Sequence, residues 1–453
     1  MAEHNTDVII IGMGPGGESV GGQLGEAGLN VIGIEANLVG GECPYYGCIP
    51  SKMMIRAANA LAEVGHVEGL AGTAEAKPDW APVAQRIREQ ATANWDDQIA
   101  VDRFVGKGGT FVRGRGVITG PKTVQVGDDT YVASKGIVIA TGTQALVPPI
   151  PGLEGTPYWT NKEIVQVEEL PSSMIVLGGG VIGLELGQAI SRFGVDISVV
   201  EGAERLLSNF EPEVGDTLKE TLTNGGIKVH TGQFAEKVDY DEASGFTLTL
   251  ADGATVTGEK MLVAVGRKTF LKEIGVGKLG IDEDSNFMST DENTQVQDGL
   301  WAVGDIAGKG FYTHLAHKQA DVTVAHILGK DPVHVNYDAM AAVVFTDPEI
   351  GVVGKSEAEA RAAGINVKTA SKLVAHTARG WMHMNGNDGF IKLIVDADKD
   401  LLIGATSVGP HGGEVLGLLA LAVHAEIPIA TLRSMTYAYP TFYMGVSDAL
   451  NEL

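Results

Sequence analysis

The sequence has few cysteines and no long apolar run. Its 453 residues include only two cysteines, Cys43 and Cys48, which excludes a secreted disulfide framework and a four-thiolate zinc or iron–sulfur site. The longest apolar stretch, Val415–Val423, has nine residues, whereas a helix that spans a bilayer needs about 20. No signal peptide is recognisable at the amino terminus. We therefore expect a cytoplasmic protein without a membrane partner.

Basic residues are also scarce. Lysine and arginine number 33 against 57 aspartates and glutamates, which gives a formal net charge of −24. An acidic surface of that size argues against nucleic acid and anionic membranes as partners. Glycine, by contrast, is abundant at 61 residues, while proline contributes only 17. Because the glycines follow no G-X-Y period, collagen is excluded, and we expect them at turns and close backbone approaches.

Two segments of the chain, Asp7–Glu35 and Ser173–Glu201, repeat one pattern. Each opens with a short aliphatic run typical of a buried parallel strand, followed by G-x-G-x-x-G, a helical stretch and a second aliphatic strand that ends in glutamate. In both copies the glutamate lies 23 residues after the first glycine. The fingerprint glycines are Gly12, Gly14 and Gly17 in the first copy and Gly178, Gly180 and Gly183 in the second.

This repeated context predicts two dinucleotide sites. A lone G-x-G-x-x-G is weak evidence, but its full strand–turn–helix–strand–acid setting occurs here twice. The first glycine permits the tight turn, the second lets the backbone approach a pyrophosphate, and the third lets helix pack against strand. The helix N-terminus holds the phosphates, and Glu35 and Glu201 would accept hydrogen bonds from the riboses. Hydride transfer between the two dinucleotides is the natural use.

Glu201 also bears on which nicotinamide cofactor binds. A carboxylate at that position repels a ribose 2′-phosphate, and neither Gly202 nor Ala203 offers a basic side chain to hold one. NADH is therefore favoured over NADPH, although Arg205 lies nearby.

Three further aliphatic runs end in tight turns: Ile137–Gly142, Met261–Gly266 and Leu300–Asp305. The first two make Thr141, Gly142 and Gly266 candidate cofactor-binding residues. The third ends in Asp305, whose carboxylate would bind a polyol or ribose, cap the following helix, or do both. Beyond about residue 335 such fingerprints stop. Alternating strands such as 389–398 and a helix around Gly413–His424 predict an α+β domain there.

The two cysteines lie five residues apart in GGECPYYGCIPSK. Two unrelated buried cysteines are one alternative, and a metal site is poor because two thiolates without nearby histidines leave coordination unfilled. A redox disulfide fits better. Five residues of regular helix rise about 7.5 Å, whereas bridged Cα atoms lie about 4.4–6.8 Å apart. We therefore expect a bent, non-helical segment around Pro44 and Gly47, followed by a helix over 51–64.

On these motifs, the chain resembles the flavoprotein pyridine nucleotide–disulfide oxidoreductases over essentially its whole length. GGECPYYGCIPSK is similar to the redox-disulfide motif of that family, and LAHKQA and FTDPEIGVVG resemble its dihydrolipoamide dehydrogenase and mercuric reductase branch. The resemblance implies FAD on the first fingerprint, NAD(P)H on the second, and Asp305 on the ribityl chain. It also implies that Cys48 faces the flavin, that Cys43 meets the substrate, and that Lys52 and Glu185 form an ion pair beside the flavin ring.

One departure from the family pattern lies near the carboxyl terminus. The family motif H-P-T-x-x-E supplies a histidine from the partner subunit, oriented by the glutamate, as general acid/base. Here YAYPTFYM puts Tyr439 in the histidine place and Met444 in the glutamate place. Tyrosine, with an ordinary pKa of about 10, is a poor proton shuttle at neutral pH. Mercuric reductase also has a tyrosine in that region, but this chain has no C-terminal cysteine pair. Tyr437, Tyr443 and His383 are possible substitutes.

The expected fold is therefore α/β, with two Rossmann-like dinucleotide-binding domains and a C-terminal α+β dimerisation domain. We predict an FAD-binding domain over 1–152 and 271–334, an NAD(P)H-binding domain over 153–270 and an interface domain over 335–453. The favoured function is an NADH-dependent FAD disulfide oxidoreductase that reduces a small-molecule acceptor, uses no metal and acts as a homodimer. A diaphorase-type quinone or metal-ion reductase that bypasses the disulfide is the alternative, and a redox-sensing protein with little turnover is a third.

Overall fold

The chain folds into two compact units, each assembled from three separate stretches. The computed structural model describes residues 2–453. The first unit comprises Met1–Pro50, Gln85–Leu146 and Arg267–Val335, and the second comprises Ser51–Ala84, Val147–Gly266 and Asn336–Leu453. Within residues 2–453, no helix is long and apolar enough to cross a membrane.

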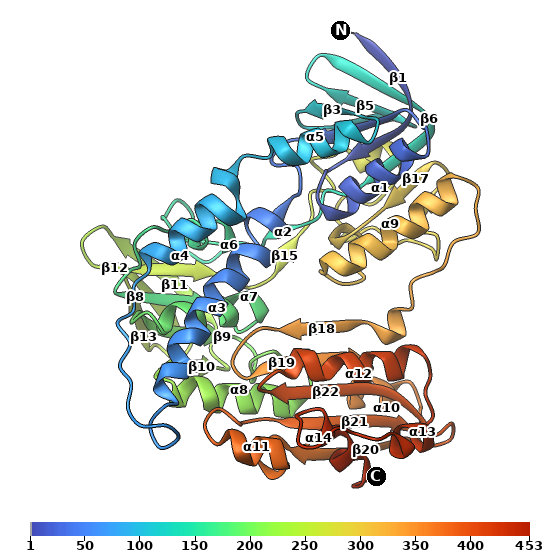
Figure 1. Ribbon diagram of the computed structural model, residues 1–453. Coiled ribbons are helices and arrows are strands. Elements are labelled where there is room, and N and C mark those ends of the chain that lie inside the picture. Colours follow the sequence, from blue (N-terminus) through green and yellow to red (C-terminus); the bar gives the residue numbers. More distant parts are fainter. Residues whose placement is uncertain (1) are drawn as a thin grey trace. The chain divides into compact units, whose positions relative to one another are not determined.

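An eight-stranded sheet forms the centre of the first unit (Figure 1). Its main path runs β16-β17-β6-β1-β2-β3, in which all neighbours are parallel except β16 and β17, and β5 and β4 continue antiparallel from β6. The strands are β1 (Glu3–Ile11), β2 (Val31–Glu35), β3 (Gly109–Arg113), β4 (Val117–Gly120), β5 (Thr123–Val126), β6 (Asp129–Ile139), β16 (Gln295–Gln297) and β17 (Leu300–Ala302).

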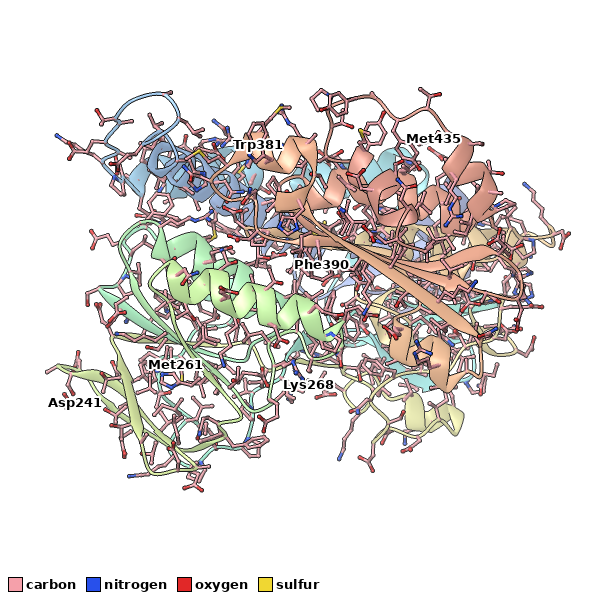
Figure 2. All side chains as sticks on the ribbon, turned by 90° about the horizontal axis from the view of Figure 1, so that it is seen from below. Asp241, Met261, Lys268, Trp381, Phe390 and Met435 are labelled. Carbon is pink, nitrogen blue, oxygen red and sulfur yellow. The ribbon has the colours of Figure 1, made fainter. Side chains whose placement is uncertain are left out.

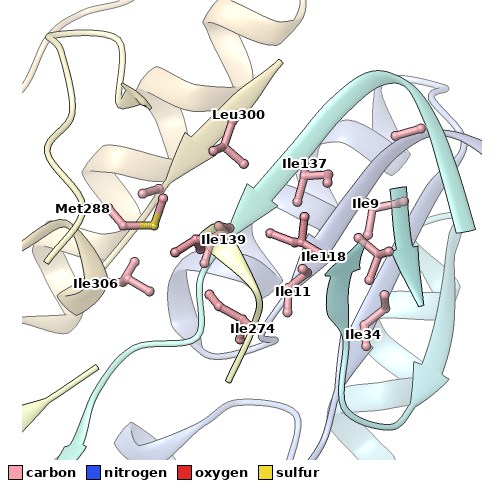
Figure 3. Packing of buried hydrophobic residues seen from close by; sticks show 14 of the residues in the cluster. Ile9, Ile11, Ile34, Ile118, Ile137, Ile139, Ile274, Met288, Leu300 and Ile306 are labelled. Carbon is pink, nitrogen blue, oxygen red and sulfur yellow. The ribbon is translucent and has the colours of Figure 1, made fainter. Parts of the chain in front are cut away.

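Both faces of this sheet are buried. Val8 and Ile10 of β1 pack under the helices α1 (Pro15–Glu26), α5 (Gln98–Gly106) and α9 (Thr313–Ile327). Ile9 and Ile11 point to the opposite face, where they join a cluster that Figure 3 shows. A strand buried on both faces needs an unbroken aliphatic run, which explains the sequence pattern. The parallel pairing also brings the carboxyl ends of β1 and β2 together.

The second unit contains a smaller parallel sheet with the order β10-β9-β8-β14. The helix α7 packs on β8 and β9, and α8 packs on β10. A three-stranded antiparallel sheet, β11-β12-β13, follows in the same region. The elements are β8 (Ser173–Leu177), α7 (Val181–Ser191), β9 (Asp196–Glu201), α8 (Pro212–Asn224), β10 (Lys228–Thr231), β11 (Ala235–Asp241), β12 (Gly245–Leu250), β13 (Thr255–Gly258) and β14 (Lys260–Val263).

A five-stranded antiparallel sheet with the order β18-β19-β22-β21-β20 forms the rest of the second unit, and α12 packs on β19 and β22. The elements are β18 (Ala341–Val344), β19 (Glu349–Gly354), α10 (Glu357–Ala362), β20 (Val367–Leu373), α11 (Ala378–His383), β21 (Phe390–Asp396), β22 (Leu401–Gly409), α12 (Gly412–His424), α13 (Ile429–Ser434) and α14 (Met444–Leu450). In Figure 2, Trp381 marks α11 and Phe390 marks the start of β21.

The alternation predicted for β21 is wrong, because all seven of its residues are buried. Ile391 and Leu393 pack in the cluster that includes α12 and α14, while Ile394 packs against Ala360 of α10 on the other face. The two polar side chains of the strand, Lys392 and Asp396, are buried as well, and Lys392 lies in a carboxylate cluster. The strand β21 is therefore covered on both faces, whereas the sequence suggested a strand with one exposed face.

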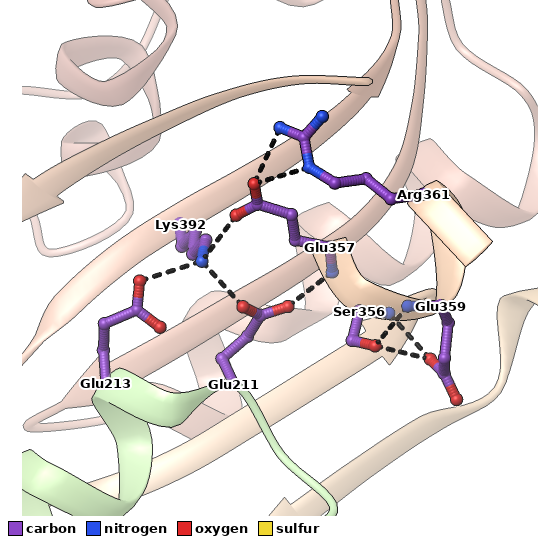
Figure 4. Close-up of polar contacts among 7 residues, drawn as sticks. All are labelled: Glu211, Glu213, Ser356, Glu357, Glu359, Arg361 and Lys392. Atoms are coloured by element: carbon purple, nitrogen blue, oxygen red, sulfur yellow. Dashed lines mark hydrogen bonds and ion pairs between the residues drawn. The ribbon is translucent and has the colours of Figure 1, made fainter. Parts of the chain in front are cut away.

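Lys392 connects three elements of the second unit (Figure 4). Its Nζ lies 2.6 Å from Glu211 Oε2, 2.9 Å from Glu213 Oε1 and 3.1 Å from Glu357 Oε2. Burial alone would lower the pKa of Lys392, but the hydrogen bonds to these three carboxylates outweigh it and raise that pKa. Since Glu211 and Glu213 lie at the start of α8 and Glu357 begins α10, this charged cluster fixes both helices to the interior of β21.

Candidate functional site

The two predicted fingerprints form equivalent strand-to-helix turns. Gly12 has φ +95°, and a Cβ built on it would lie 2.5 Å from the carbonyl oxygen of Ala140. Gly178 has φ +111°, and its Cβ would lie 2.4 Å from the carbonyl oxygen of Ala264. The third glycines meet the first: a Cβ on Gly17 would lie 2.0 Å from Gly12 O, and one on Gly183 would lie 2.6 Å from Gly178 O. These glycines are required by the fold itself.

The second glycines are different, because no atom of residues 2–453 crowds them. A Cβ on Gly14 would meet only the Cα of Gly41, at 3.9 Å, and one on Gly180 would meet nothing within 4 Å. They are the N-cap residues of α1 and α7, and neither helix has a side-chain cap. Open space beside uncapped N–H groups is what a pyrophosphate requires. Both turns therefore fit a dinucleotide.

The closing glutamates make the same hydrogen bonds in both copies. Glu35 Oε2 accepts from Met13 N at 2.7 Å, and its Oε1 accepts from Asn37 N at 2.8 Å. Glu201 Oε2 accepts from Gly179 N at 2.5 Å, and its Oε1 accepts from Ala203 N at 2.7 Å. In each case the donors are the residue after the first glycine and the second residue after the glutamate. Burial raises the pKa of Glu35, although its backbone hydrogen bonds oppose the shift.

The basic residue that follows Glu201 most closely in the sequence is Arg205. Its Nε lies 3.0 Å from Asp216 Oδ1 in an ion pair. Phe234, whose side chain is 68% exposed, lies against Gly202, since a Cβ on that glycine would come within 2.6 Å of the ring. The site thus presents a carboxylate, an exposed aromatic ring and an arginine already engaged with an acid.

Asp305 lies at the turn after β17 and begins a short 3₁₀ helix, Asp305–Ala307, whose N-cap is Gly304. Since the N-cap residue is Gly304, the predicted role of Asp305 as a helix cap is wrong. Its Oδ2 instead accepts from Thr143 Oγ1 at 2.8 Å. Burial raises the pKa of Asp305, against the lowering effects of Thr143 and Arg267. The carboxylate is partly exposed, with 26% of the side chain accessible, so it remains open to a polyol.

The other predicted turn residues have the expected backbone freedom. Gly142 has φ +62° and Gly266 has φ +138°. Next to Gly142, the buried Oγ1 of Thr141 has no hydrogen-bond partner within residues 2–453. A polar ligand atom would satisfy this hydroxyl, which is a second indication that a cofactor fits the first unit.

The cysteines lie on two consecutive helices. Cys43 is in the one-turn helix α2 (Glu42–Tyr45), and Cys48 begins α3 (Cys48–Gly65). The bend lies at Tyr46–Gly47, so the expected break exists, but Pro44 is inside α2 and not in a loop. The helix α3 is longer than the predicted 51–64, since it begins at Cys48 and ends at Gly65. Cys48 Sγ lies 3.5 Å from Thr313 Oγ1, the first residue of α9.

Lys52 and Glu185 are joined within the second unit. Lys52 Nζ lies 2.7 Å from Glu185 Oε2, and the Glu185 side chain is 4% exposed. The other oxygen, Oε1, accepts from the backbone N–H of Phe345 at 2.8 Å, and Lys52 Nζ lies 4.6 Å from the centre of the Phe345 ring. A buried carboxylate with both oxygens engaged holds the lysine ammonium in one place.

Further polar contacts lie one and two turns after Glu185, at Gln188 and Arg192. Gln188 exchanges hydrogen bonds with the backbone of Asp347, and Arg192 bonds Asp347 Oδ2 at 2.6 Å and Asn59 Oδ1 at 2.5 Å. Asn59 and Lys52 both belong to α3. The bonds Lys52–Glu185 and Asn59–Arg192 therefore connect α3 to α7 at two points. The position of Lys52 is therefore determined by the packing of α3 against α7.

Tyr439 is 68% exposed and borders a cavity of about 240 Å³. The cavity lining also includes Lys372, His376, Thr441 and Met444. Of the possible substitutes, Tyr437 donates to the carbonyl of Leu432 at 3.1 Å, and Tyr443 accepts from Ala438 N at 2.9 Å. Burial lowers the pKa of His383, whose ring lies edge-on to Phe442.

Comparisons with known proteins agree with this geometry. Residues 6–320 match the model of the pyridine nucleotide-disulphide oxidoreductase family, and residues 340–449 match the dimerisation domain of the same family. The chain belongs to this family. It is therefore an NAD(P)H-dependent FAD oxidoreductase of the disulfide-reductase type, as its motifs indicated.

Among curated relatives, the dihydrolipoyl dehydrogenase of Thermus scotoductus is 32% identical over 469 residues, covering 99% of this chain and 97% of that protein. The dihydrolipoyl dehydrogenase of Halobacterium salinarum is 30% identical, with 98% and 95% covered. Among solved structures, the HOCl-induced flavoprotein disulfide reductase RclA from Escherichia coli superposes with a TM-score of 0.85 at 24% identity, with 98% and 99% covered. LpdA from Mycobacterium tuberculosis gives the same values. These structures confirm the predicted α/β fold.

Sequence reasoning missed four polar residues around the family motifs. Arg267 and Thr143 surround Asp305, Glu42 precedes Cys43, and Thr313 lies beside Cys48. Two of them had a signal in the sequence, since Arg267 directly follows Gly266 and Glu42 directly precedes the first cysteine. Only the tertiary structure shows that Arg267 and Glu42 meet.

Proposed function

We propose that the protein is an NADH-dependent FAD disulfide oxidoreductase, which passes electrons from NADH through FAD to the Cys43–Cys48 disulfide and then to a small-molecule acceptor. The observation that carries the proposal is the position of Lys52. Lys52 follows Cys48 by one turn of α3 and is held by the buried Glu185 at 2.7 Å. A fixed cation one turn from a candidate redox thiol is suited to negative charge that develops during electron transfer.

The two nucleotides have separate candidate sites. Gly14, Glu35 and Asp305 would hold FAD in the first unit, and Gly180 and Glu201 would hold the nicotinamide nucleotide in the second. When bound, a flavin accepts a hydride from a reduced nicotinamide and passes two electrons to a neighbouring disulfide. The residues of the chain supply the phosphate sites, the ribose acceptors and the ammonium group.

Reduction of the proposed disulfide consumes two electrons and one proton. Two electrons and one proton convert the Cys43–Cys48 bond into one thiolate and one thiol. We assign the thiolate to Cys48, which begins α3 and therefore benefits from the N–H groups of the helix N-terminus. The hydroxyl of Thr313 lies 3.5 Å from Cys48 Sγ and can donate to a thiolate there. Cys43 is then the thiol that meets the acceptor.

The proposal of NADH rests on the charges near Glu201. That carboxylate would repel a 2′-phosphate, and Arg205 is engaged with Asp216. The exposed ring of Phe234 beside Gly202 offers an uncharged surface for an adenine. We therefore expect kcat/KM for NADH to exceed that for NADPH.

A homodimer is supported by the matched dimerisation domain and by exposed apolar residues of the second unit. Trp381 is 73% exposed, Met384 50% and Tyr439 68%. Large exposed apolar side chains of this kind are candidates for burial in a protein interface. In such a dimer each subunit would contribute Tyr439 to its partner.

The second candidate is a diaphorase-type reductase that does not use the disulfide. Tyr439 and Met444 favour it, because tyrosine is a weak proton shuttle at neutral pH and methionine cannot orient it by charge. The acceptor for this chemistry would be a quinone or a metal ion. The two candidates differ in their need for the cysteines.

Turnover with a panel of disulfide, quinone and metal-ion acceptors separates the candidates. NADH-driven rates would be measured for the wild type, Cys43→Ser, the double Cys→Ser variant and Tyr439→His. The proposal expects at least a ~100-fold loss of kcat for the physiological class of acceptor in Cys43→Ser, since the attacking thiol is absent. Full activity of the double variant with every acceptor would establish the diaphorase instead. A gain for disulfides in Tyr439→His would support a thiol relay that lacks only a proton shuttle.

A further inference from the structure

Arg267 is the centre of a polar cluster in the first unit. It begins the short strand β15 (Arg267–Lys268), which pairs with β7 (Gln144–Ala145). Its side chain is only 12% exposed. Its Nε donates to Thr143 Oγ1 at 2.5 Å, and its Nη2 donates to the carbonyl of Thr143 at 2.8 Å. Two bonds to one residue fix the plane of the guanidinium.

The same Nη2 donates to Glu42 Oε2 at 2.6 Å. Glu42 is the first residue of α2 and directly precedes Cys43, and its carbonyl oxygen accepts from Tyr46 N at 2.7 Å to close that turn. Arg267 therefore holds the helical turn that carries Cys43. A link of this kind restrains a segment that three glycines, Gly40, Gly41 and Gly47, would otherwise leave free to move.

The pair also balances charge at this position. Asp305 lies 3.9 Å from Arg267 Nε, with Thr143 bonded between them. On the side of Tyr45, the charged groups Glu18, Arg103, Asp96 and Asp97 also lie near α2. Arg103 pairs with Glu18, and Asp97 pairs with Arg113. Glu42 directly precedes Cys43 in the sequence, and its carboxylate is paired with the guanidinium of Arg267.

We propose that Arg267 and Glu42 are positioning residues for Cys43: Arg267 holds the turn of α2 and cancels the carboxylate charge that would otherwise oppose formation of the Cys43 thiolate. This inference deepens the proposed function and rests on it. It assigns a role to a partly buried ion pair outside the two fingerprints and outside the Lys52–Glu185 pair. The attack of Cys43 on an acceptor would need the thiolate, so the pair would set the pH range of that step.

Alkylation of the reduced holoenzyme tests the inference directly. The protein, reduced anaerobically with NADH, would be treated with iodoacetamide from pH 5 to 9.5, and modification of the Cys43 peptide would be followed by mass spectrometry. The variants are Arg267→Gln, Glu42→Gln and the double variant. Lys228→Gln is the control, since Lys228 forms an exposed pair with Asp196.

A neutralising pair predicts shifts of opposite sign. Arg267→Gln should raise the midpoint pH of Cys43 alkylation by about 1 unit, Glu42→Gln should lower it by a similar amount, and the double variant should return close to the wild type. A merely structural pair would shift both single variants in the same direction or in neither, and that result would overturn the inference. If Arg267→Gln does not fold, Glu42→Gln alone decides. A lower midpoint pH of Cys43 alkylation in that variant supports the inference, and an unchanged midpoint overturns it.

The failure of the proposed function is a different result. If NADH does not make two cysteines of the wild-type protein accessible to iodoacetamide, the disulfide is not reduced in turnover, and the proposed function is wrong. If both cysteines react but the variants leave the midpoint unchanged, only the inference about Arg267 and Glu42 is wrong.

Discussion

At the scale of single residues, the fingerprint glycines divide into those the fold needs and those a ligand needs. Gly178 has φ +111° and a carbonyl oxygen where its Cβ would be, whereas Gly180 has open space. Sequence spacing alone gives all three glycines of a fingerprint the same weight. The structure separates them and makes the nucleotide hypothesis testable by a matched pair of substitutions.

Gly180→Ala and Gly178→Ala should therefore differ in kind. Gly180→Ala should leave the melting temperature within a few degrees of the wild type, but raise the KM for NADH at least ~10-fold, because its methyl group would occupy the phosphate approach. Gly178→Ala should lower the melting temperature markedly, since its backbone conformation and the Ala264 carbonyl exclude a Cβ. Thermal melts and NADH titrations of both variants check this. An unchanged KM in a folded Gly180→Ala protein would contradict the second nucleotide site.

Residue identities near a motif can be predicted from sequence only where spacing constrains them. The repeat predicted Glu35 and Glu201 together, and the structure gives them equivalent hydrogen bonds. Arg267 lies 225 residues from Glu42, so no local pattern could pair them. Their roles at the site, like those of the other candidate residues, stay predictions.

At the scale of elements, helices and strands with strong local patterns were predicted well. The two β–α–β units follow from aliphatic runs and glycine turns, because those patterns determine the local backbone. The strand β21 was mispredicted because burial of its second face depends on α10 and on three distant carboxylates. The helical turn α2 was mispredicted as a loop because it contains Pro44. Proline is tolerated in the first turn of a helix, so its presence did not exclude one.

Lys392→Met should destabilise the second unit strongly. Removing the ammonium leaves Glu211, whose side chain is 4% exposed, as a buried carboxylate without its cation. Breaking a buried ion pair in this way typically costs about 3–5 kcal/mol. Urea unfolding measures the loss, and Lys399→Met is the control because Lys399 is 71% exposed beside Asp396. Equal stability of both variants would show that the cluster in Figure 4 contributes little.

At the scale of the whole molecule, family membership and the α/β fold are established, and the division into four segments stays a prediction. The candidate residues for FAD lie in the first unit, and those for the nicotinamide nucleotide lie in the second. The helix α3 belongs to both units, since it begins at Cys48 and carries Lys52. Because Cys48 and Lys52 lie one turn apart on this helix, the proposed function assigns the thiolate and the ammonium group to the same step.

Anaerobic titration with NADH tests that assignment most directly. One equivalent of NADH should give the wild-type protein a long-wavelength thiolate–flavin absorbance band, and Cys48→Ser should abolish it. Cys43→Ser should show such a band before any NADH is added, because Cys48 is then left as a thiolate without a disulfide partner. A wild-type protein that bleaches its flavin without such a band, or a band that survives Cys48→Ser, would contradict the account.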